Sequence, residues 1–318
     1  MSLRNVPVVK LIDPSVQTIK DMRAMTGPKT IIIVRKFFKF QPLSNPHQEA
    51  TNWENIFYPY VTAGLDNNIV FEGYNEISEA DTAPHAIFEK RRQDFLHGYG
   101  YGGVYGNHGV GNLNNENVKP YTSLIANFSD RDFFGWHSYW GTGQTVLNPW
   151  HTLRWSLVDM LKDVPGLVTE MGRDYVKDIN LASNLWGKRG WKLSGISSKE
   201  YREEIDLYGK ALDTYPNMAG ATLFLVGPCE KQWDNYQAEE VYRIGSTTVT
   251  EPYFYFDQPS LLSSPQPPNP PVTPVVDETK EAVEKLLIDL SKQLTEAQIR
   301  LGNAEGLIEK LKGIIYEQ

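Results

Sequence analysis

Short apolar runs alternate with longer amphipathic segments from residue 6 to about residue 260. The runs have the length of strands and lack a polar face, which is typical of parallel strands covered by helices on both sides. The predicted strands cover residues 6–12, 29–37, 67–76, 102–109, 133–140, 166–172 and 220–228. The predicted helices cover residues 14–25, 47–63, 84–100, 120–128, 152–164 and 199–215.

This order of elements indicates an α/β fold, and seven β/α units over roughly 250 residues suit a (β/α)₈ TIM barrel better than an open sheet. An open doubly wound sheet would carry a phosphate-binding loop after its first strand, and residues 10–15 contain neither a Gly-x-Gly-x-x-Gly nor a Walker sequence. The glycine-rich residues 98–106 lead into a strand and are interpreted as a loop. The count is one strand short, so the first strand either lies upstream of this sequence or has no recognisable pattern within it. The abrupt start on a strand favours the first alternative.

The end of the chain has a different pattern. Seven of the twenty prolines lie between Pro259 and Pro274, which predicts an extended spacer. After it, apolar residues recur in steps of four and three through residues 283–315, which favours a coiled coil and a homo-oligomer over a single helix docked on its own domain. The predicted organisation is a barrel over residues 1–258, a linker over 259–276 and a coiled-coil helix over 277–318.

Composition excludes several classes of partner. The 39 acidic residues outnumber the 31 basic ones, for a net charge of −8, so a cationic surface for nucleic acid or anionic lipid is not expected. No apolar run is long enough to span a membrane. The single cysteine, Cys229, completes neither an internal disulfide nor a zinc motif, and no cluster of His, Asp and Glu has metal-binding spacing. We therefore expect no metal and no cofactor.

Polar residues gather at the predicted strand ends, where a barrel of this kind carries its chemistry. Glu76 and Glu170 stand out because each closes an apolar strand, and a carboxylate is costly to bury unless it is paired or functional. Two carboxylates facing one cleft are the minimal equipment for glycoside hydrolysis. The alternative is that they form structural ion pairs with Lys10, Arg35 or Arg173.

The spacing of three strand-end motifs makes the chain resemble the clan A glycoside hydrolases, which are retaining (β/α)₈ enzymes. Asn75-Glu76 and Glu170 lie three predicted strands apart, and His137-Ser138-Tyr139 ends the strand before Glu170. With one strand missing at the start, the resemblance implies Glu76 as acid/base on strand four and Glu170 as nucleophile on strand seven. It also implies that Tyr139 contacts the nucleophile and that Trp233 is an aromatic sugar platform.

The resemblance covers residues 6–235 and has two departures. Glu76 is followed by Ile77 where the clan commonly has proline, and the basic residue near the nucleophile is Lys10, with Arg35 one strand later. The expected substrate-binding residues are Asn75, His137, Tyr139, Trp140, Trp233, Arg35, Lys10, Asn107 and His108.

Some of these residues also have structural interpretations. Asn75 is a suitable cap for a turn, His137 could simply order a strand end, and His108 lies in a glycine-rich stretch that suits a solvated loop. Most tryptophans are expected in the core, including Trp53 and Trp155 on predicted helices, and Trp140 and Trp233 are the preferred candidates for a sugar site.

The first functional hypothesis is a retaining hydrolase of a β-linked oligo- or polysaccharide. The second is a non-catalytic carbohydrate-binding or structural barrel displayed on a coiled-coil stalk. The compartment stays open: a polymeric glycan suits an extracellular or cell-surface location, whereas the first residues lack the apolar segment of a secretory signal.

Overall fold

The computed structural model describes residues 6–141, 145–175, 189–224, 226 and 233–241. Within these residues seven parallel strands pair in chain order in one sheet. The strands are β1 (Val8–Ile12), β2 (Ile31–Arg35), β3 (Ile69–Glu72), β4 (Gly102–His108), β5 (Phe133–Gly141), β6 (Gly166–Asp174) and β7 (Met218–Leu223). All seven predicted strands form, and the β/α barrel fold class is confirmed.

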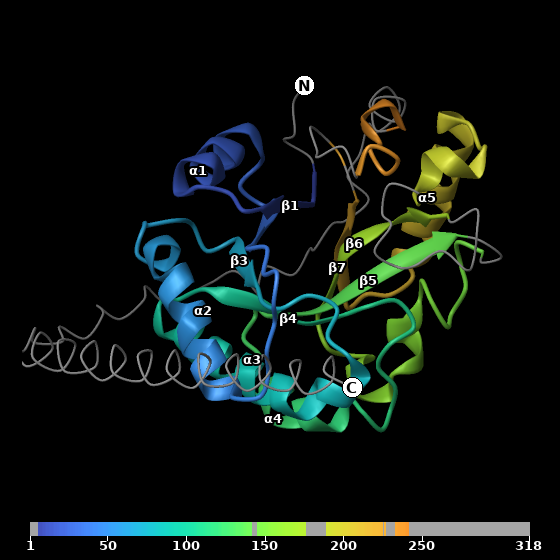
Figure 1. Cartoon of the computed structure of the whole chain (residues 1–318). Helices are drawn as coiled ribbons and strands as arrows, with labels where there is room; N and C mark the ends of the chain where they lie inside the picture. Colours follow the sequence, from blue (N-terminus) through green and yellow to red (C-terminus); the bar gives the residue numbers. More distant parts are fainter. Residues whose placement is uncertain (1–5, 142–144, 176–188, 225, 227–232, 242–318) are drawn as a thin grey trace, which may run out of the picture. The chain divides into compact units, whose positions relative to one another are not determined.

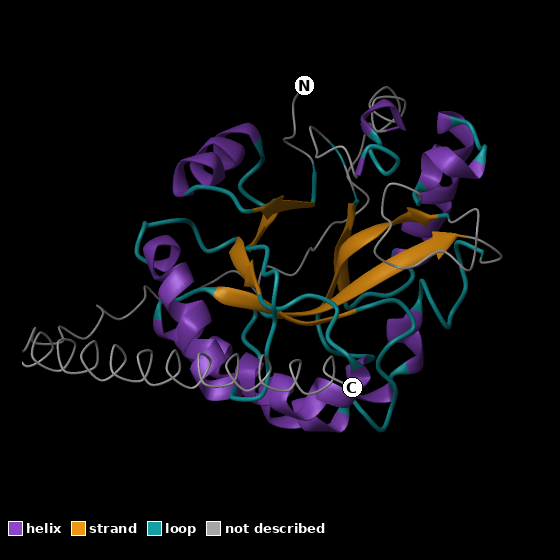
Figure 2. Cartoon of the chain, viewed as in Figure 1, coloured by secondary structure: helices purple, strands orange, loops and turns teal. Residues whose placement is uncertain are grey.

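The helices lie outside the curved sheet, and several begin where the sequence supplies a cap (Figures 1 and 2). Ser15, Asn45 and Ser197 each accept a hydrogen bond from a backbone N–H of the following first turn. The α-helices are α1 (Val16–Met25), α2 (Pro46–Val61), α3 (Thr82–Gly98), α4 (Thr122–Ile125) and α5 (Ser198–Leu212). The 3₁₀-helices are η1 (Glu79–Asp81), η2 (Lys119–Tyr121), η3 (Arg154–Leu157), η4 (Asp159–Leu161) and η6 (Trp191–Ser194).

The predicted helix over residues 152–164 is not an α-helix. Two short 3₁₀-helices, η3 and η4, take its place, and Val158 between them has extended backbone angles. Val158 is fully buried, as is the nearby Trp155. Packing of this segment against the core therefore overrides its helical pattern.

One apolar layer shows that the sheet curls back on itself. Six buried side chains from β1, β2, β3, β4, β6 and β7 form a single cluster, with Phe133 of β5 packed against it: Val8, Ile33, Val70, Val104, Leu167 and Ala219. Strands from both edges of the sheet can share one small cluster only if the sheet encloses it. At the seam, a Cβ added to Gly220 of β7 would lie 2.7 Å from Cγ2 of Val8 in β1.

The larger core lies between the outer face of the sheet and the helices, and Ile32, Phe71, Val168, Trp53 and Phe88 are among its members. None of the helices in the described part of the chain has the length and apolarity needed to cross a bilayer. The predicted linker and coiled-coil helix lie outside the described residues. An eighth strand is not among them either, so the expected upstream strand stays a prediction.

Candidate active site

Charged side chains lie directly above the apolar layer because strand residues alternate between two faces. Lys10 follows Val8 by two residues, Arg35 follows Ile33 by two, and Glu72 follows Val70 by two. All three point to the inside of the barrel at the carboxyl ends of β1, β2 and β3. The strand pattern therefore places two cations and one carboxylate in a shared, buried space.

A β-bulge in β6 turns Glu170 into the same space. Strict alternation would place Glu170 on the face of Val168, which belongs to the outer core. The register between β5 and β6 shifts between Trp136 and His137, so that Thr169 is an extra residue of β6 and Glu170 pairs with His137. Bulges re-aim side chains in this way next to functional sites.

Glu170 is held as a buried carboxylate by three hydrogen-bond donors. Its Oε1 accepts hydrogen bonds from Lys10 Nζ at 2.9 Å and from Arg35 Nη1 at 2.8 Å, and its Oε2 accepts one from Tyr139 Oη at 2.8 Å. Burial alone would raise the pKa of Glu170, but the positive charges of His137, Lys10 and Arg35 outweigh burial and hold it well below its usual range. Glu170 is thus ionised at neutral pH. The ion pairs with Lys10 and Arg35 that were the alternative explanation for Glu170 are present.

Tyr139 is the neutral donor of this group. Burial, then the charges of Glu170 and Glu76, raise the pKa of the Tyr139 hydroxyl well above its ordinary value. The hydroxyl therefore keeps its proton and donates to Glu170. This is the contact that the sequence resemblance implies for Tyr139.

Glu72 is a member of the cluster that was not predicted from the sequence. Its side chain is completely buried; Oε1 accepts from Lys10 Nζ at 2.9 Å and lies 3.8 Å from Arg35 Nε. Lys10 therefore bridges Glu72 and Glu170. The sequence contains a signal for Glu72, because it lies two residues after Val70 in an apolar strand and so shares its face. The predicted strand extends to Glu76, and the carboxylate at that end was the predicted site residue.

Glu76 reaches the cluster from a loop beyond β3. Its backbone has a positive φ of 50°, and its N–H donates to the carbonyl of Asn107 at 2.9 Å. A non-glycine residue in this conformation costs of order 1–3 kcal/mol and is typically held by its surroundings at functional sites. The side chain of Glu76 is 41% exposed, so this carboxylate lies at the mouth of the barrel while Glu170 lies deeper.

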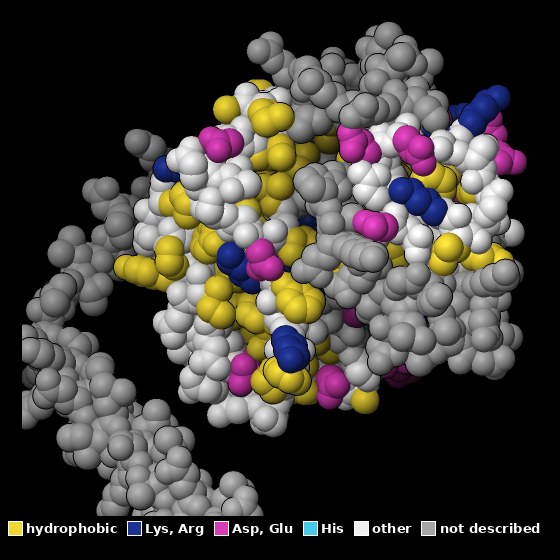
Figure 3. Space-filling view, turned by 45° about the horizontal axis from the view of Figure 1, so that its top comes forward, with side chains coloured by type: hydrophobic (Ala, Val, Ile, Leu, Met, Phe, Trp, Pro, Cys, Tyr) yellow, Lys and Arg dark blue, Asp and Glu magenta, His cyan; other side chains and the backbone are white. Residues whose placement is uncertain are grey.

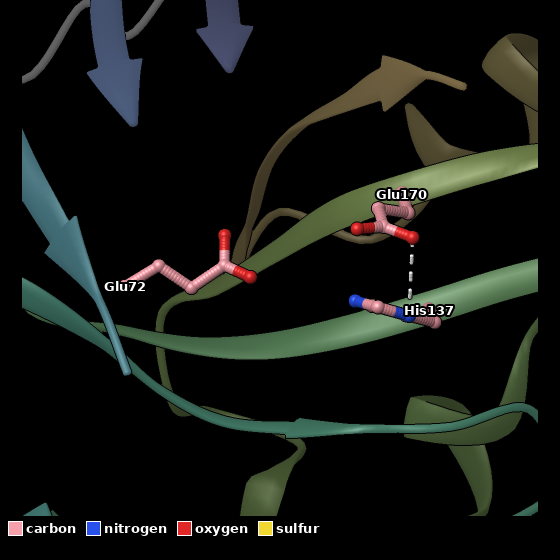
Figure 4. A group of neighbouring side chains, drawn as sticks. All are labelled: Glu72, His137 and Glu170. Carbon is pink, nitrogen blue, oxygen red and sulfur yellow. Dashed lines mark ion pairs between the residues drawn. The ribbon is translucent and has the colours of Figure 1, made fainter. Parts of the chain in front are cut away.

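His137 joins the two carboxylates. Its Nδ1 lies 2.9 Å from Glu76 Oε1 and 3.5 Å from Glu170 Oε2. The two oxygens can therefore be no farther apart than the sum of these distances. His137 and Glu170 face each other across the space between β5 and β6, with Glu72 pointing toward them from β3 (Figure 4).

Glu72, His137 and Glu170 also offer atoms that lie within 4.8 Å of one another, a spacing that a metal ion can bridge. Lys10 and Arg35 already occupy oxygens of both carboxylates. Two fixed positive charges at these atoms oppose the binding of a further cation. The charges of this cluster favour an ion-pair site over a metal centre.

Asn107 and His108 are buried, and a second bulge sets their directions. The register between β4 and β5 shifts between Tyr105 and His108, and Asn107 has a positive φ of 46°. Asn107 faces the inside, where its Oδ1 accepts from Thr169 Oγ1 at 3.2 Å. His108 faces the helices, not the site, and its Nε2 lies 2.9 Å from the hydroxyl of Tyr121.

His108 belongs to a buried polar chain behind the sheet. The Tyr121 hydroxyl also contacts His85 Nδ1 at 2.8 Å, and His85 Nε2 lies 3.0 Å from Glu89 Oε1. Burial, then the neighbouring His85, lower the pKa of His108 to about 3. The expected solvated loop and the expected substrate contact are both replaced by a structural role, because His108 is the outward residue of the bulged strand.

Trp140 is a core residue. It is 1% exposed, stacks on Tyr208 with ring centroids 5.7 Å apart, and donates from Nε1 to Glu204 at 2.8 Å. Alternation explains this, because His137 and Tyr139 point inward and Trp140 must then point outward. The predicted sugar contact for Trp140 is therefore corrected to helix–sheet packing.

Trp233 is half-buried and connects to the site through Phe224. Its ring meets Phe224 edge-on at 5.4 Å, and Phe224 meets Tyr139 edge-on at 6.1 Å. Other aromatic side chains are exposed on the loops after β2 and β5, namely Phe37, Phe40 and Trp150. The two phenylalanines were not among the residues predicted from the sequence.

Comparisons with known proteins give structural likeness only. No protein-family model and no curated protein sequence matches the chain. Among solved structures, XacCel5A in complex with cellopentaose is 12% identical with a TM-score of 0.44, covering 73% of this chain and 80% of its own. A family 5 xyloglucanase from Paenibacillus pabuli in complex with ligand is 10% identical with a TM-score of 0.43, covering 76% of this chain and 86% of its own. At these scores the likeness carries no argument about activity.

Proposed function

We propose that this protein is a retaining glycoside hydrolase that cleaves a β-linked oligo- or polysaccharide, with Glu170 as nucleophile and Glu76 as general acid and base. The observation that carries the proposal is the convergence of these two carboxylates on Nδ1 of His137, although they are 94 positions apart in the chain. Two carboxyl groups that approach one nitrogen atom are close enough to flank a single scissile bond.

The distances favour a retaining mechanism. Inverting enzymes hold their carboxyl groups roughly 6.5–9.5 Å apart to admit a water molecule, whereas retaining enzymes hold them about 5–5.5 Å apart. The Glu76 and Glu170 oxygens lie 2.9 Å and 3.5 Å from the same His137 nitrogen, a closeness that suits the shorter separation of a retaining enzyme.

The surroundings of Glu170 suit a nucleophile, and the exposed position of Glu76 suits a group that exchanges protons with leaving group and water. In the first step an oxygen of ionised Glu170 attacks the anomeric carbon, while protonated Glu76 donates its proton to the departing glycosidic oxygen. In the second step Glu76, now ionised, takes a proton from water, whose oxygen attacks the same carbon and releases Glu170. Lys10, Arg35 and Tyr139 keep Glu170 ionised and oriented, and the exposure of Glu76 lets leaving group and water reach it.

A carbohydrate substrate agrees with the surface composition. Aromatic rings stack on the C–H faces of sugars, and the exposed Phe37, Phe40 and Trp150 lie on loops that follow strand ends. On the face shown in Figure 3, basic side chains are scattered among acidic and hydrophobic ones and do not form a patch for a polyanion. An oligo- or polysaccharide is therefore the ligand class that we propose.

The proposal is tested with a panel of aryl β-glycosides and β-linked polysaccharides. We expect the wild-type protein to hydrolyse at least one of them with net retention of configuration, as followed by NMR of the first-formed sugar. Glu170→Ala should lose at least 10⁴-fold in kcat, on the order expected for removal of a nucleophile. Glu203→Ala, which removes an exposed glutamate of α5, is the matched control and should behave as wild type.

The role of Glu76 has a separate test. Glu76→Ala should still form the glycosyl-enzyme from a substrate with an activated leaving group, and added azide should restore turnover and yield a β-glycosyl azide. An absence of rescue would contradict the assignment of Glu76. If wild type and Glu170→Ala are equally inert on every substrate while both bind the glycan, the protein is the non-catalytic binding barrel instead.

A further inference from the structure

The loop between β2 and α2 is tied directly to the residue that precedes Glu76. Gln41 donates from Nε2 to the carbonyl oxygen of Asn75 at 2.8 Å, and its Oε1 accepts a hydrogen bond from the N–H of Asn75. One side-chain amide thus satisfies both backbone polar groups of one residue, as a neighbouring strand would. This pairing is made across 34 positions of sequence.

Glu76 needs such support because the sheet no longer provides it. The strand β3 ends at Glu72, so residues 73–76 have left the parallel ladder, and the backbone of Glu76 has a positive φ. On the other side, the carbonyl of Asn107 accepts the N–H of Glu76, and a Cβ added to Gly109 would lie 3.5 Å from Glu76 Cγ. Gln41 and the end of β4 therefore hold the acid/base from both sides.

The loop that carries Gln41 is itself anchored. The N–H of Phe37 donates to Asp13 Oδ1 at 2.9 Å, and the ring of Phe38 meets that of Tyr74 at 5.3 Å. Tyr74 in turn donates from its hydroxyl to Glu49 of α2 at 3.1 Å. Gln41 is therefore presented to Asn75 by a loop with fixed attachments, although Phe40 beside it is 76% exposed.

We propose that Gln41 is a positioning residue for the acid/base: by holding the backbone of Asn75 it keeps the Glu76 carboxyl at the distance from the glycosidic oxygen at which a proton can be transferred. This inference rests on the proposed function. It makes a prediction that a merely structural role does not, because only substrates that need protonation of the leaving group depend on the position of Glu76.

The experiment compares kcat/KM for two substrates that carry the same sugar, one with a 2,4-dinitrophenyl leaving group and one with an unactivated phenyl leaving group. kcat/KM reports the first chemical step, in which the dinitrophenolate departs without a proton. For Gln41→Ala we expect a loss of about 10- to 100-fold on the phenyl substrate, as is typical of a displaced catalytic group, and no more than about threefold on the dinitrophenyl substrate. Thermal unfolding and circular dichroism check the fold.

Two further variants sharpen the result. Gln48→Ala removes an exposed glutamine whose side-chain amide donates to Asn52 of its own helix, and should leave both substrates unchanged. Gln41→Glu keeps the acceptor for the N–H of Asn75 but turns an acceptor oxygen toward its carbonyl, and should give a loss with the same leaving-group dependence. This second variant tests the inference if Gln41→Ala does not fold.

The outcomes separate this inference from the proposed function. If Gln41→Ala loses activity equally on the two substrates, or loses none, the role of Gln41 is overturned. The hydrolase proposal stays intact in that case as long as the wild type is active and Glu170→Ala is inactive. A wild-type protein that cleaves no member of the panel of glycosides and polysaccharides would remove both.

Discussion

At the scale of single residues, the central feature is a buried carboxylate that stays ionised. Glu170 lies beside Lys10, Arg35 and His137, and their charges lower its pKa more than burial raises it. A depressed carboxyl pKa contributes stability that is fully present above the unfolded value near 4.5 and is lost as the pH falls through the folded value. The same charges that make Glu170 a nucleophile therefore support folding at neutral pH.

Replacing Lys10 tests this charge balance. Lys10→Met removes one cation from Glu170, so its pKa should rise, and the acidic limb of the kcat/KM profile should move to higher pH by about one pH unit or more. The wild type should keep its activity down to the pH at which it unfolds. The control is Lys162→Met, which removes an exposed lysine paired with Asp159 and should not change the profile.

Lys10 also neutralises Glu72, so Lys10→Met should cost about 3–5 kcal/mol of unfolding free energy, as when one partner of a buried ion pair is removed. The double variant Lys10→Met/Glu72→Gln loses one charge of each sign and should recover part of that stability. Urea denaturation at pH 7 measures the difference. Strict additivity of the two single substitutions would show that Lys10 is not shared as the contacts indicate.

His108 provides a second pH-dependent prediction. Its folded pKa of about 3 lies below the unfolded value of 6.5, so the unfolded chain binds the extra proton and stability falls as the pH drops below about 6.5. His108→Gln should lower the free energy of unfolding at pH 7, because it loses the contact of His108 with Tyr121. Between pH 6.5 and pH 4, however, the stability of this variant should fall less than that of the wild type. His47→Gln, at an exposed helical position, should retain the wild-type slope.

At the scale of elements, the contact between β7 and β1 is the seam of the barrel. A side chain on Gly220 would meet Val8 at 2.7 Å, and Gly220 has a positive φ of 150°. Gly220→Ala should therefore destabilise the fold by about 1–3 kcal/mol, through overpacking and backbone strain.

Val8→Ala removes the atom that Gly220→Ala would contact. The double variant should be less destabilised than the sum of the two single variants, as measured by urea unfolding. A sum that is simply additive would contradict the close approach of the two edge strands.

At the scale of the whole molecule, the heptad pattern of residues 283–315 stays a prediction of self-association. Placing charges at two seam positions, as in Leu290→Glu/Leu294→Glu, should shift the protein to monomers in sedimentation equilibrium. Hydrolysis of a small aryl glycoside per chain should not change, whereas retention on an insoluble polysaccharide should weaken because multivalent binding is lost. Oligomers that persist in this variant would contradict the coiled-coil hypothesis.

The apolar and polar pattern alone determined the positions of the seven strands and of most helices of the described chain. Each strand carries its own signal, an apolar run with length and flanking turns, so the positions of β1 to β7 follow from the sequence. The pattern also placed Lys10, Arg35, Glu170 and Tyr139 at strand ends, and the closed sheet brings these ends together. Local propensity failed for residues 152–164, where burial of Val158 decided the backbone.

Only the tertiary structure decided which side chains face the site. Bulges at Thr169 and at Gly106–Asn107 reverse the phase of alternation, so Glu170 turns inward and His108 outward, and a bulge depends on pairing with a neighbouring strand that is distant in sequence. The attachment of Gln41 to Asn75 and the meeting of Glu76 with Glu170 at His137 depend on loop conformations with no periodic signal. Periodicity describes one strand at a time, whereas a site is made by contacts between strands and loops. The sequence therefore predicted the two acids, Glu76 and Glu170, but not the contacts that position them.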